Sequence, residues 1–167
     1  MNRHGVIHYT EDDIRYIAIG NHMKESDVYE MYRTGCCWKL YERAFIRMFP
    51  AGKVVVNGKG YDLILNDQRF EIRCLNGYVQ FSQSSNTGKG RDFSEKSLRT
   101  KMEEIVGYII IDVLSFPHVD WWYIMVDEIK ELRKEKLISK KTAADRCRFY
   151  RALEYLTADE YDADDYI

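Results

Sequence analysis

The segment GKGYDLILNDQRFEIRC, residues 58–74, contains the strongest structural signal in the chain. Short runs rich in branched and aromatic residues lie on both sides of Asn66 and Asp67, which predicts two antiparallel strands joined by a tight turn. With the turn centred between these two residues, Asp62 lies opposite Glu71. Like charges in facing positions repel, and a carboxylate on a covered face of a sheet is costly unless a partner neutralises it.

Two interpretations of this acid pair are open. In the first, a divalent cation joins Asp62 and Glu71, and oxygen ligands completed by water suit Mg²⁺ or Mn²⁺. In the second, the hairpin lies on the surface, both acids face solvent, and Arg73 and Arg69 form salt bridges with them. The alternation of polar and apolar residues is compatible with both interpretations.

Residues 1–50 are predicted to form three helices. Thr10 precedes three acids, which is a helix-start signal, because acids interact favourably with the positive end of the helix dipole. Apolar residues then recur at helical spacing up to Phe49, and Pro50 ends the pattern. We expect these helices to pack against a sheet, since their apolar faces need a partner layer, and a small helix-turn-helix is the alternative.

After Pro50 the apolar period changes to two, which indicates strands. Four short runs, separated by turn signals, are expected to form an antiparallel meander: 53–58, 61–67, 69–75 and 78–84. The remaining predicted elements are a helix at 93–105, strands at 106–114 and 121–127, and helices at 127–137 and 140–156. This order predicts an α+β, or mixed α/β, three-layer sandwich with a central mixed sheet that contains the meander and is flanked by helices.

Length and composition fit one soluble domain. The chain has 167 residues, of which 46% are hydrophobic, enough to bury a core. We expect one domain over residues 1–157, made of a helical part at 1–50, a sheet core at 51–126 and helices at 127–157. No apolar run approaches the roughly 18 to 20 residues that span a bilayer. The first residues lack the apolar stretch of a signal peptide, so a cytoplasmic protein without membrane contact is expected.

Cysteine and charge patterns exclude further classes. The four cysteines include an adjacent pair and no C-x-x-C spacing, which argues against both a zinc site and a disulfide framework. The predicted acidic tail, residues 158–167, has five acids and no base, so the net charge of −2 for the whole chain corresponds to +3 for the remainder. The tail is expected to be either a solvated terminus or a nucleic-acid mimic or autoinhibitory flap that lies over a basic groove.

The acid pattern resembles that of the PD-(D/E)xK nuclease superfamily, which includes many restriction endonucleases. The similarity lies in Asp62, followed after eight residues by Glu71-Ile72-Arg73, on two strands that come after a helix with Glu42. It covers roughly residues 36–126, about half the chain, and it implies a restriction-endonuclease-like fold. It further implies that Asp62 and Glu71 bind the catalytic metal with the carbonyl of Ile72, and that Glu42 is an accessory acid.

Two positions depart from the pattern. A Gly-Tyr pair replaces the proline before Asp62, and Arg73 replaces the catalytic lysine. A guanidinium can hold a phosphate through two hydrogen bonds, but it does not give up a proton as an amine can. Three outcomes stay open: a slow nuclease, an enzyme that uses Lys89 from the following loop, or an inactive DNA-binding protein.

The loop and helix after the hairpin are expected to face DNA. Residues 87–101 hold five bases and two acids, and two glycines allow the backbone to approach a phosphate. The candidate nucleic-acid-binding residues are Lys89, Arg91, Ser85, Asn86 and Arg99. A solvated loop followed by a charged helix face is the alternative.

The sequence thus predicts a Mg²⁺- or Mn²⁺-dependent DNA endonuclease of the restriction-enzyme type. Asp62 and Glu71 hold the metal, Arg73 contacts the scissile phosphate and Glu42 supports the site. A homodimer fits an enzyme that cuts both strands. The alternatives are an inactive protein of the same fold that binds DNA or a protein partner, such as a factor in phage–host conflict, and a phage-encoded inhibitor with an acidic decoy tail.

Overall fold

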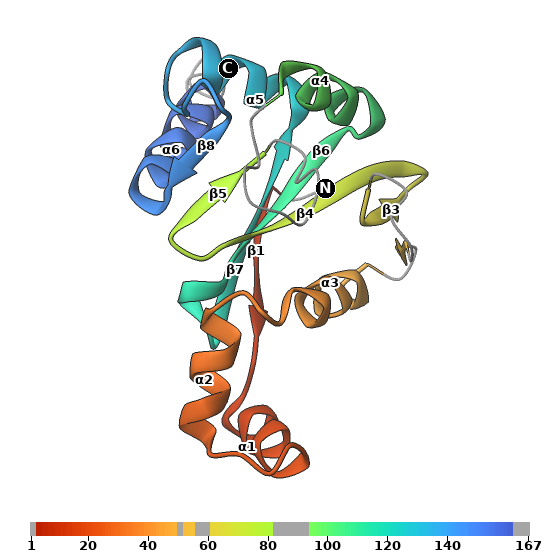
Figure 1. The fold of residues 1–167 in the computed structure, drawn as a ribbon, viewed down its shortest axis with the longest axis vertical. Helices are drawn as coiled ribbons and strands as arrows, with labels where there is room; N and C mark the ends of the chain where they lie inside the picture. Colours follow the sequence, from red (N-terminus) through yellow and green to blue (C-terminus); the bar gives the residue numbers. More distant parts are fainter. Residues whose placement is uncertain (1–2, 50–51, 56–60, 82–93, 162–167) are drawn as a thin grey trace.

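The computed structural model describes residues 3–49, 52–55, 61–81 and 94–161 (Figure 1). In chain order the elements are β1 (His4–His8), α1 (Glu11–Gly20), α2 (Glu25–Arg33), α3 (Trp38–Arg47), β2 (Lys53–Val54), β3 (Leu63–Leu65), β4 (Gln68–Leu75), β5 (Tyr78–Gln80), α4 (Glu95–Glu104), β6 (Gly107–Asp112), the 3-10 helix η1 (Val113–Ser115), β7 (His118–Met125), α5 (Val126–Lys134), β8 (Ala143–Asp145) and α6 (Arg146–Tyr161).

The main sheet has six strands in the order β1-β7-β6-β4-β3-β2. Neighbouring strands are antiparallel except β4 and β6, which are parallel. A parallel pair cannot be joined by a tight turn, and α4 lies in the long connection between these two strands. The sheet is therefore mixed, as the sequence predicted. Strand β4 belongs both to the parallel pair and to the β3–β4 hairpin.

The β3–β4 hairpin has the predicted register. Leu65 pairs with Gln68, and the turn between them consists of Asn66 and Asp67 with φ angles of 48° and 61°. Positive φ at both turn residues is characteristic of a type I′ turn, whose twist suits two strands joined by two residues. Asn and Asp tolerate this conformation better than most residues, so the local sequence determines which residues face each other.

Helices cover both faces of the main sheet (Figure 1). The side chains of β6 alternate between two hydrophobic cores: Ile109 and Ile111 pack with residues of α1, α2 and α3, whereas Tyr108 and Ile110 pack with residues of α5 and α6. All four side chains are fully buried. The predicted α+β sandwich is confirmed, and α1 and α2 pack into the first core, as expected for helices that cover a sheet.

The structure corrects the predicted division of the chain. Residues His4–His8, within the part predicted to be helical, form β1, which pairs with β7. The run at 78–84 does not continue the meander, because β5 pairs with β8 in a separate two-stranded sheet. β8 lies within the predicted helix at 140–156, and α6 continues through Tyr161 into the predicted tail. These short strands depend on partners distant in sequence, which local periodicity does not reveal.

All four cysteines are free. In the described part of the chain, no helix combines the length and the apolar content needed to cross a membrane. The candidate DNA-contacting residues Lys89, Arg91, Ser85 and Asn86 lie outside the described residues, as do residues 162–167 of the acidic tail.

Candidate active site

Asp62 and Glu71 meet where the β3–β4 hairpin begins. Asp62 comes just before β3, and Glu71 lies on β4. The recorded register ends with Leu63 opposite Phe70, and the amide of Asp62 donates to the carbonyl of Phe70, so the ladder does not continue regularly to the predicted pair of Asp62 with Glu71. The Oδ2 atom of Asp62 accepts a hydrogen bond of 2.8 Å from the backbone amide of Ile72. This bond holds the Asp62 side chain against the strand that contains Glu71, so the two carboxylates belong to one site.

Each carboxylate oxygen of Glu71 contacts a cation. Oε1 lies 2.6 Å from Nη1 of Arg73, and Oε2 accepts a hydrogen bond from Nζ of Lys101 on α4. Glu71 and Lys101 are 5% and 3% exposed. Burial raises the pKa of Glu71 above its ordinary value, the Arg73 guanidinium opposes the rise, and the charge of Asp62 adds to it.

The solvent-facing interpretation of the hairpin is wrong for Glu71, because this side chain is buried and in contact with α4. The salt bridge to Arg73 that this interpretation expected is confirmed. Arg69, the other expected partner, instead lies over the ring of Tyr61, 4.9 Å from its centroid. Asp62 itself is half-buried.

Lys101 is the site residue that the sequence analysis missed. The predicted helix at 93–105 has Leu98, Met102 and Ile105 on one face, and Lys101 falls on the same face because it is three residues after Leu98. A lysine within an apolar stripe was therefore an available signal. Arg99, the predicted DNA contact on this helix, is exposed and does not join the cluster.

Glu42 adds a third acid from the opposite layer. It lies on α3 and is 7% exposed. Burial raises the pKa of Glu42 to about 7, the charge of Asp62 adds to this shift, and Lys39 opposes it. The shift places Glu42 near half-ionisation at neutral pH, where a carboxyl group can both accept and return a proton. The three predicted acids are thus close enough for their charges to interact.

Such a concentration of charge is unusual within a core. The buried polar or charged residues of the described chain are Glu42, Glu71, Lys101, Asp112 and Thr142, and the first three belong to this cluster. Removing charges from water costs several kcal/mol per ion, and a buried ion pair is often no more stabilising than apolar residues of similar volume. Groups with shifted pKa values that gather in this way are more typical of functional sites than of cores.

The donor set suits a hard divalent cation. Mg²⁺ in proteins is commonly bound by one or two carboxylates, with water and substrate phosphate as the other ligands. Asp62 and Glu71 supply two carboxylates of this kind, and the mutual repulsion of the acids is the charge pattern that a cation relieves. Over residues 3–49, 52–55, 61–81 and 94–161, no group of three or more His, Cys, Asp and Glu side chains is arranged to hold a metal.

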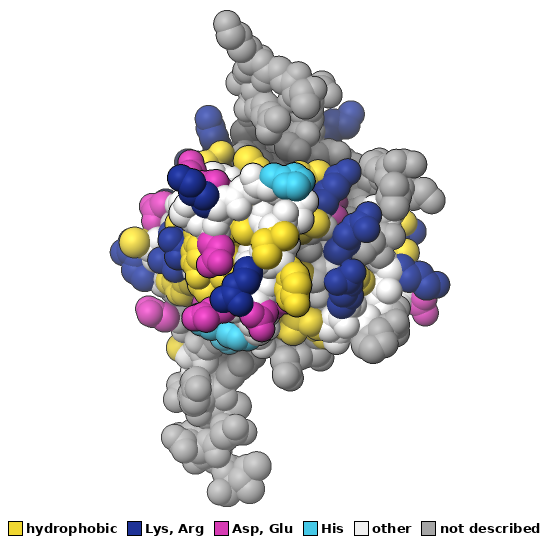
Figure 2. All heavy atoms as spheres, turned by 90° about the horizontal axis from the view of Figure 1, so that it is seen from below, with side chains coloured by type: hydrophobic (Ala, Val, Ile, Leu, Met, Phe, Trp, Pro, Cys, Tyr) yellow, Lys and Arg dark blue, Asp and Glu magenta, His cyan; other side chains and the backbone are white. Residues whose placement is uncertain are grey.

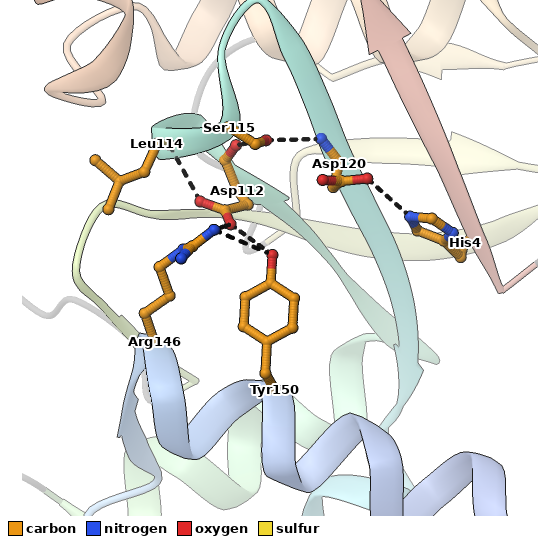
Figure 3. Close-up of polar contacts among 7 residues, drawn as sticks. All are labelled: His4, Asp112, Leu114, Ser115, Asp120, Arg146 and Tyr150. Carbon is orange, nitrogen blue, oxygen red and sulfur yellow. Dashed lines mark hydrogen bonds and ion pairs between the residues drawn. The ribbon is translucent and has the colours of Figure 1, made fainter.

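A second cluster surrounds the fully buried Asp112 at the end of β6 (Figure 3). Its Oδ2 accepts hydrogen bonds of 2.8 Å from Nε of Arg146 and 2.7 Å from the hydroxyl of Tyr150, both on α6, and its Oδ1 accepts one of 3.1 Å from the amide of Leu114. Every contact of Asp112 joins it to a neighbouring element. We therefore assign this cluster to the attachment of α6 to the sheet.

The attachment predicts a large loss of stability for Arg146→Met. The change leaves the Asp112 carboxylate buried without its cation, which is expected to lower the free energy of unfolding by about 3 kcal/mol. Chemical denaturation monitored by circular dichroism measures this difference. Arg151→Met, an exposed arginine of the same helix, is the matched control and is expected to change stability by less than about 0.5 kcal/mol. Equal stability of both variants would show that the Asp112 cluster does not hold α6.

The raised pKa of Glu42 predicts a pH-dependent stability. Between its ordinary pKa of 4.5 and about 7, the folded protein binds a proton at Glu42 that the unfolded chain has released. The stabilising contribution of this group is therefore complete below about pH 4.5 and is lost as the pH rises through about 7, with a total of about 3 kcal/mol. Urea denaturation at a series of pH values should show this decline for the wild type and a flatter profile for Glu42→Gln.

Glu30→Gln is the control for this measurement, because Glu30 is an exposed glutamate of α2. It is expected to keep the wild-type profile. A Glu42→Gln profile that runs parallel to the wild type would mean that Glu42 titrates normally.

Comparison with models of known protein families, with curated proteins and with solved structures finds no match to this chain. Fold and site together define a mixed α+β protein with a buried acid–base cluster at the junction of a hairpin, α3 and α4. The chemistry of that cluster is therefore the guide to function.

Proposed function

We propose that the protein is a metal-dependent endonuclease that hydrolyses phosphodiester bonds in DNA. The observation that supports this proposal best is the gathering of Glu42, Asp62 and Glu71 with the buried amine of Lys101 on Glu71. The chain order α3-β2-β3-β4-β5-α4-β6 also supports it, because Glu42 on α3, Asp62 just before β3 and Glu71 on β4 follow the sequence of acids that the resemblance to PD-(D/E)xK nucleases implies. Both features arise from the same stretch of chain, residues 38–112.

Each residue has a distinct part in this mechanism. Asp62 and Glu71 would hold Mg²⁺ or Mn²⁺, and the bound cation lowers the pKa of water and screens the charge of the phosphate. Glu42, with a pKa of about 7, would accept the proton of the attacking water. Arg73 keeps its charge at any relevant pH and would hold a non-bridging phosphate oxygen.

Lys101 would supply the amine that the motif lacks at position 73. Nζ donates to Glu71, so the amine lies directly at one of the two carboxylates that would hold the metal. Because Lys101 is on α4, it reaches Glu71 from outside the hairpin. The substitution at Arg73 is then compatible with catalysis, since the amine is present from another element.

A second candidate is a protein of the same fold that binds DNA without cutting it. The observation in its favour is that both carboxylate oxygens of Glu71 already contact cations, Arg73 and Lys101. A metal would have to compete with these contacts. If a metal does not displace these contacts, the site is a neutralised ion cluster, and DNA binding without cleavage is the remaining function.

Cleavage of supercoiled plasmid separates the two candidates. The wild-type protein with Mg²⁺ or Mn²⁺ is expected to produce nicked and linear DNA, and EDTA is expected to stop the reaction. Intact plasmid combined with a mobility shift would support the binding protein. Intact plasmid without any shift would reject both candidates.

A further inference from the structure

The solvent-facing side of α3 has a line of three cations. The sequence of this helix, WKLYERAFIR, contains Lys39, Arg43 and Arg47 at intervals of four residues, and all three are exposed. Its single acid, Glu42, is buried. Every charged side chain that α3 presents to solvent is thus a cation.

These cations form no salt bridge with an acid in the described part of the chain. No salt bridge or hydrogen bond joins the side chains of Lys39, Arg43 or Arg47 to another residue in the described ranges. On α5, by contrast, Lys130 pairs with Asp127, and Arg133 pairs with Glu95. The α3 cations therefore remain available to an external anion.

The spacing of the line suits a polyanion. A helix rises about 1.5 Å per residue, so the three cations follow one another at about 6 Å and extend over about 12 Å. One strand of DNA has a phosphate for about every 3.4 Å of helix axis, so the line can face three or four successive phosphates. Figure 2 shows the molecule from below, and Lys and Arg side chains gather there on the right, which is the side on which α3 lies in Figure 1.

The line also borders the candidate active site. Lys39 and Arg43 flank Glu42 in sequence, and their charges oppose the rise of its pKa. A backbone held along α3 would thus pass close to the acids. Trp38 begins the helix and is 45% exposed, and Nζ of Lys39 lies 5.1 Å from the centroid of its indole.

We propose that Lys39, Arg43 and Arg47 form a binding surface for the phosphate backbone of DNA, here named the α3 cation line. The identity of the polyanion rests on the proposed function, whereas the binding itself does not require cleavage. None of these three residues is among the DNA contacts that the sequence predicted, which were Arg99 and four residues of the loop at 82–93. It would lead the strand toward Glu42, Asp62 and Glu71.

The test is DNA binding by the triple variant K39Q/R43Q/R47Q. Fluorescence anisotropy with labelled duplex DNA is recorded in EDTA, so that no cleavage occurs, over a series of salt concentrations. The variant is expected to bind at least about tenfold more weakly at low salt, with the slope of log affinity against log salt reduced by about two to three, because each phosphate contact contributes about 0.9. Circular dichroism and thermal melting verify that the variant is folded.

The matched control is K140Q/K141Q/R151Q. It makes the same change in net charge at three exposed cations near β8 and on α6, and it is expected to keep nearly the wild-type slope. Wild-type affinity in the α3 variant, an equal loss in the control, or a wild type that does not bind DNA would each overturn the inference. A wild type that binds through the α3 cation line but cuts no DNA supports the inference and rejects only the hydrolase proposal.

Discussion

Asp62→Asn is expected to slow DNA cleavage by about 10²- to 10³-fold, the typical cost of removing one preorganised electrostatic group from a reaction centre. The amide oxygen of asparagine can still accept the hydrogen bond from Ile72. The fold should therefore survive while the negative charge needed to hold a cation is lost. Initial rates on plasmid at saturating Mg²⁺, with thermal melting of both proteins, measure the two effects.

Asp67→Asn is the matched control for this variant. It makes the same chemical change five residues later, at an exposed position of the type I′ turn, where asparagine is well tolerated. Its cleavage rate should equal that of the wild type. Undiminished cleavage by Asp62→Asn would remove Asp62 from the reaction centre.

The Glu71–Lys101 pair predicts a large, non-additive effect on stability. Glu71→Leu removes the acid that lies between Arg73 and Lys101, so two cations approach each other in a buried site, and the cost is expected to be about 3 kcal/mol. The double variant Glu71→Leu/Lys101→Met replaces both charges with apolar groups. It should recover most of that loss and be as stable as the wild type to within about 1 kcal/mol.

The same double variant should have no cleavage activity. Recovered stability without activity would indicate that the charges are kept for chemistry rather than for folding. Denaturation of the wild type, both single variants and the double variant gives the coupling energy. The exposed pair Asp127–Lys130, treated as Asp127→Leu/Lys130→Met, is the control and should show a coupling below about 1 kcal/mol. If the coupling energy of Glu71 and Lys101 is no larger than that of the exposed pair, the buried pair stabilises the fold no more than a surface salt bridge does.

The local sequence was sufficient to predict those parts of the fold that short-range conformational preferences determine. Asn66 and Asp67 favour a two-residue turn, and that turn determines the register in which Leu63 lies opposite Phe70. Thr10 begins α1 as predicted, since its hydroxyl accepts a hydrogen bond from the amide of Asp13. These features depend on residues at most about ten positions apart.

Strand pairing over long distances was not predictable in the same way. β1 has only five residues, and its pairing with β7 connects positions more than a hundred residues apart. β5 continues the strand pattern of the meander, yet it pairs with β8 because that partner is available in the folded chain. Alternation shows that a segment can be a strand, but it does not identify the partner.

The candidate site divides in the same manner. The sequence by itself determined that Asp62 and Glu71 belong to the two arms of one hairpin and that Glu42 lies on the preceding helix, because turn geometry and helical periodicity are local properties. Only the tertiary structure decided that Lys101 meets Glu71. That contact requires β6 to pair parallel to β4 and α4, which connects them in the chain, to pack against β4. The burial that raises the pKa values of Glu42 and Glu71 exists only after these layers have assembled.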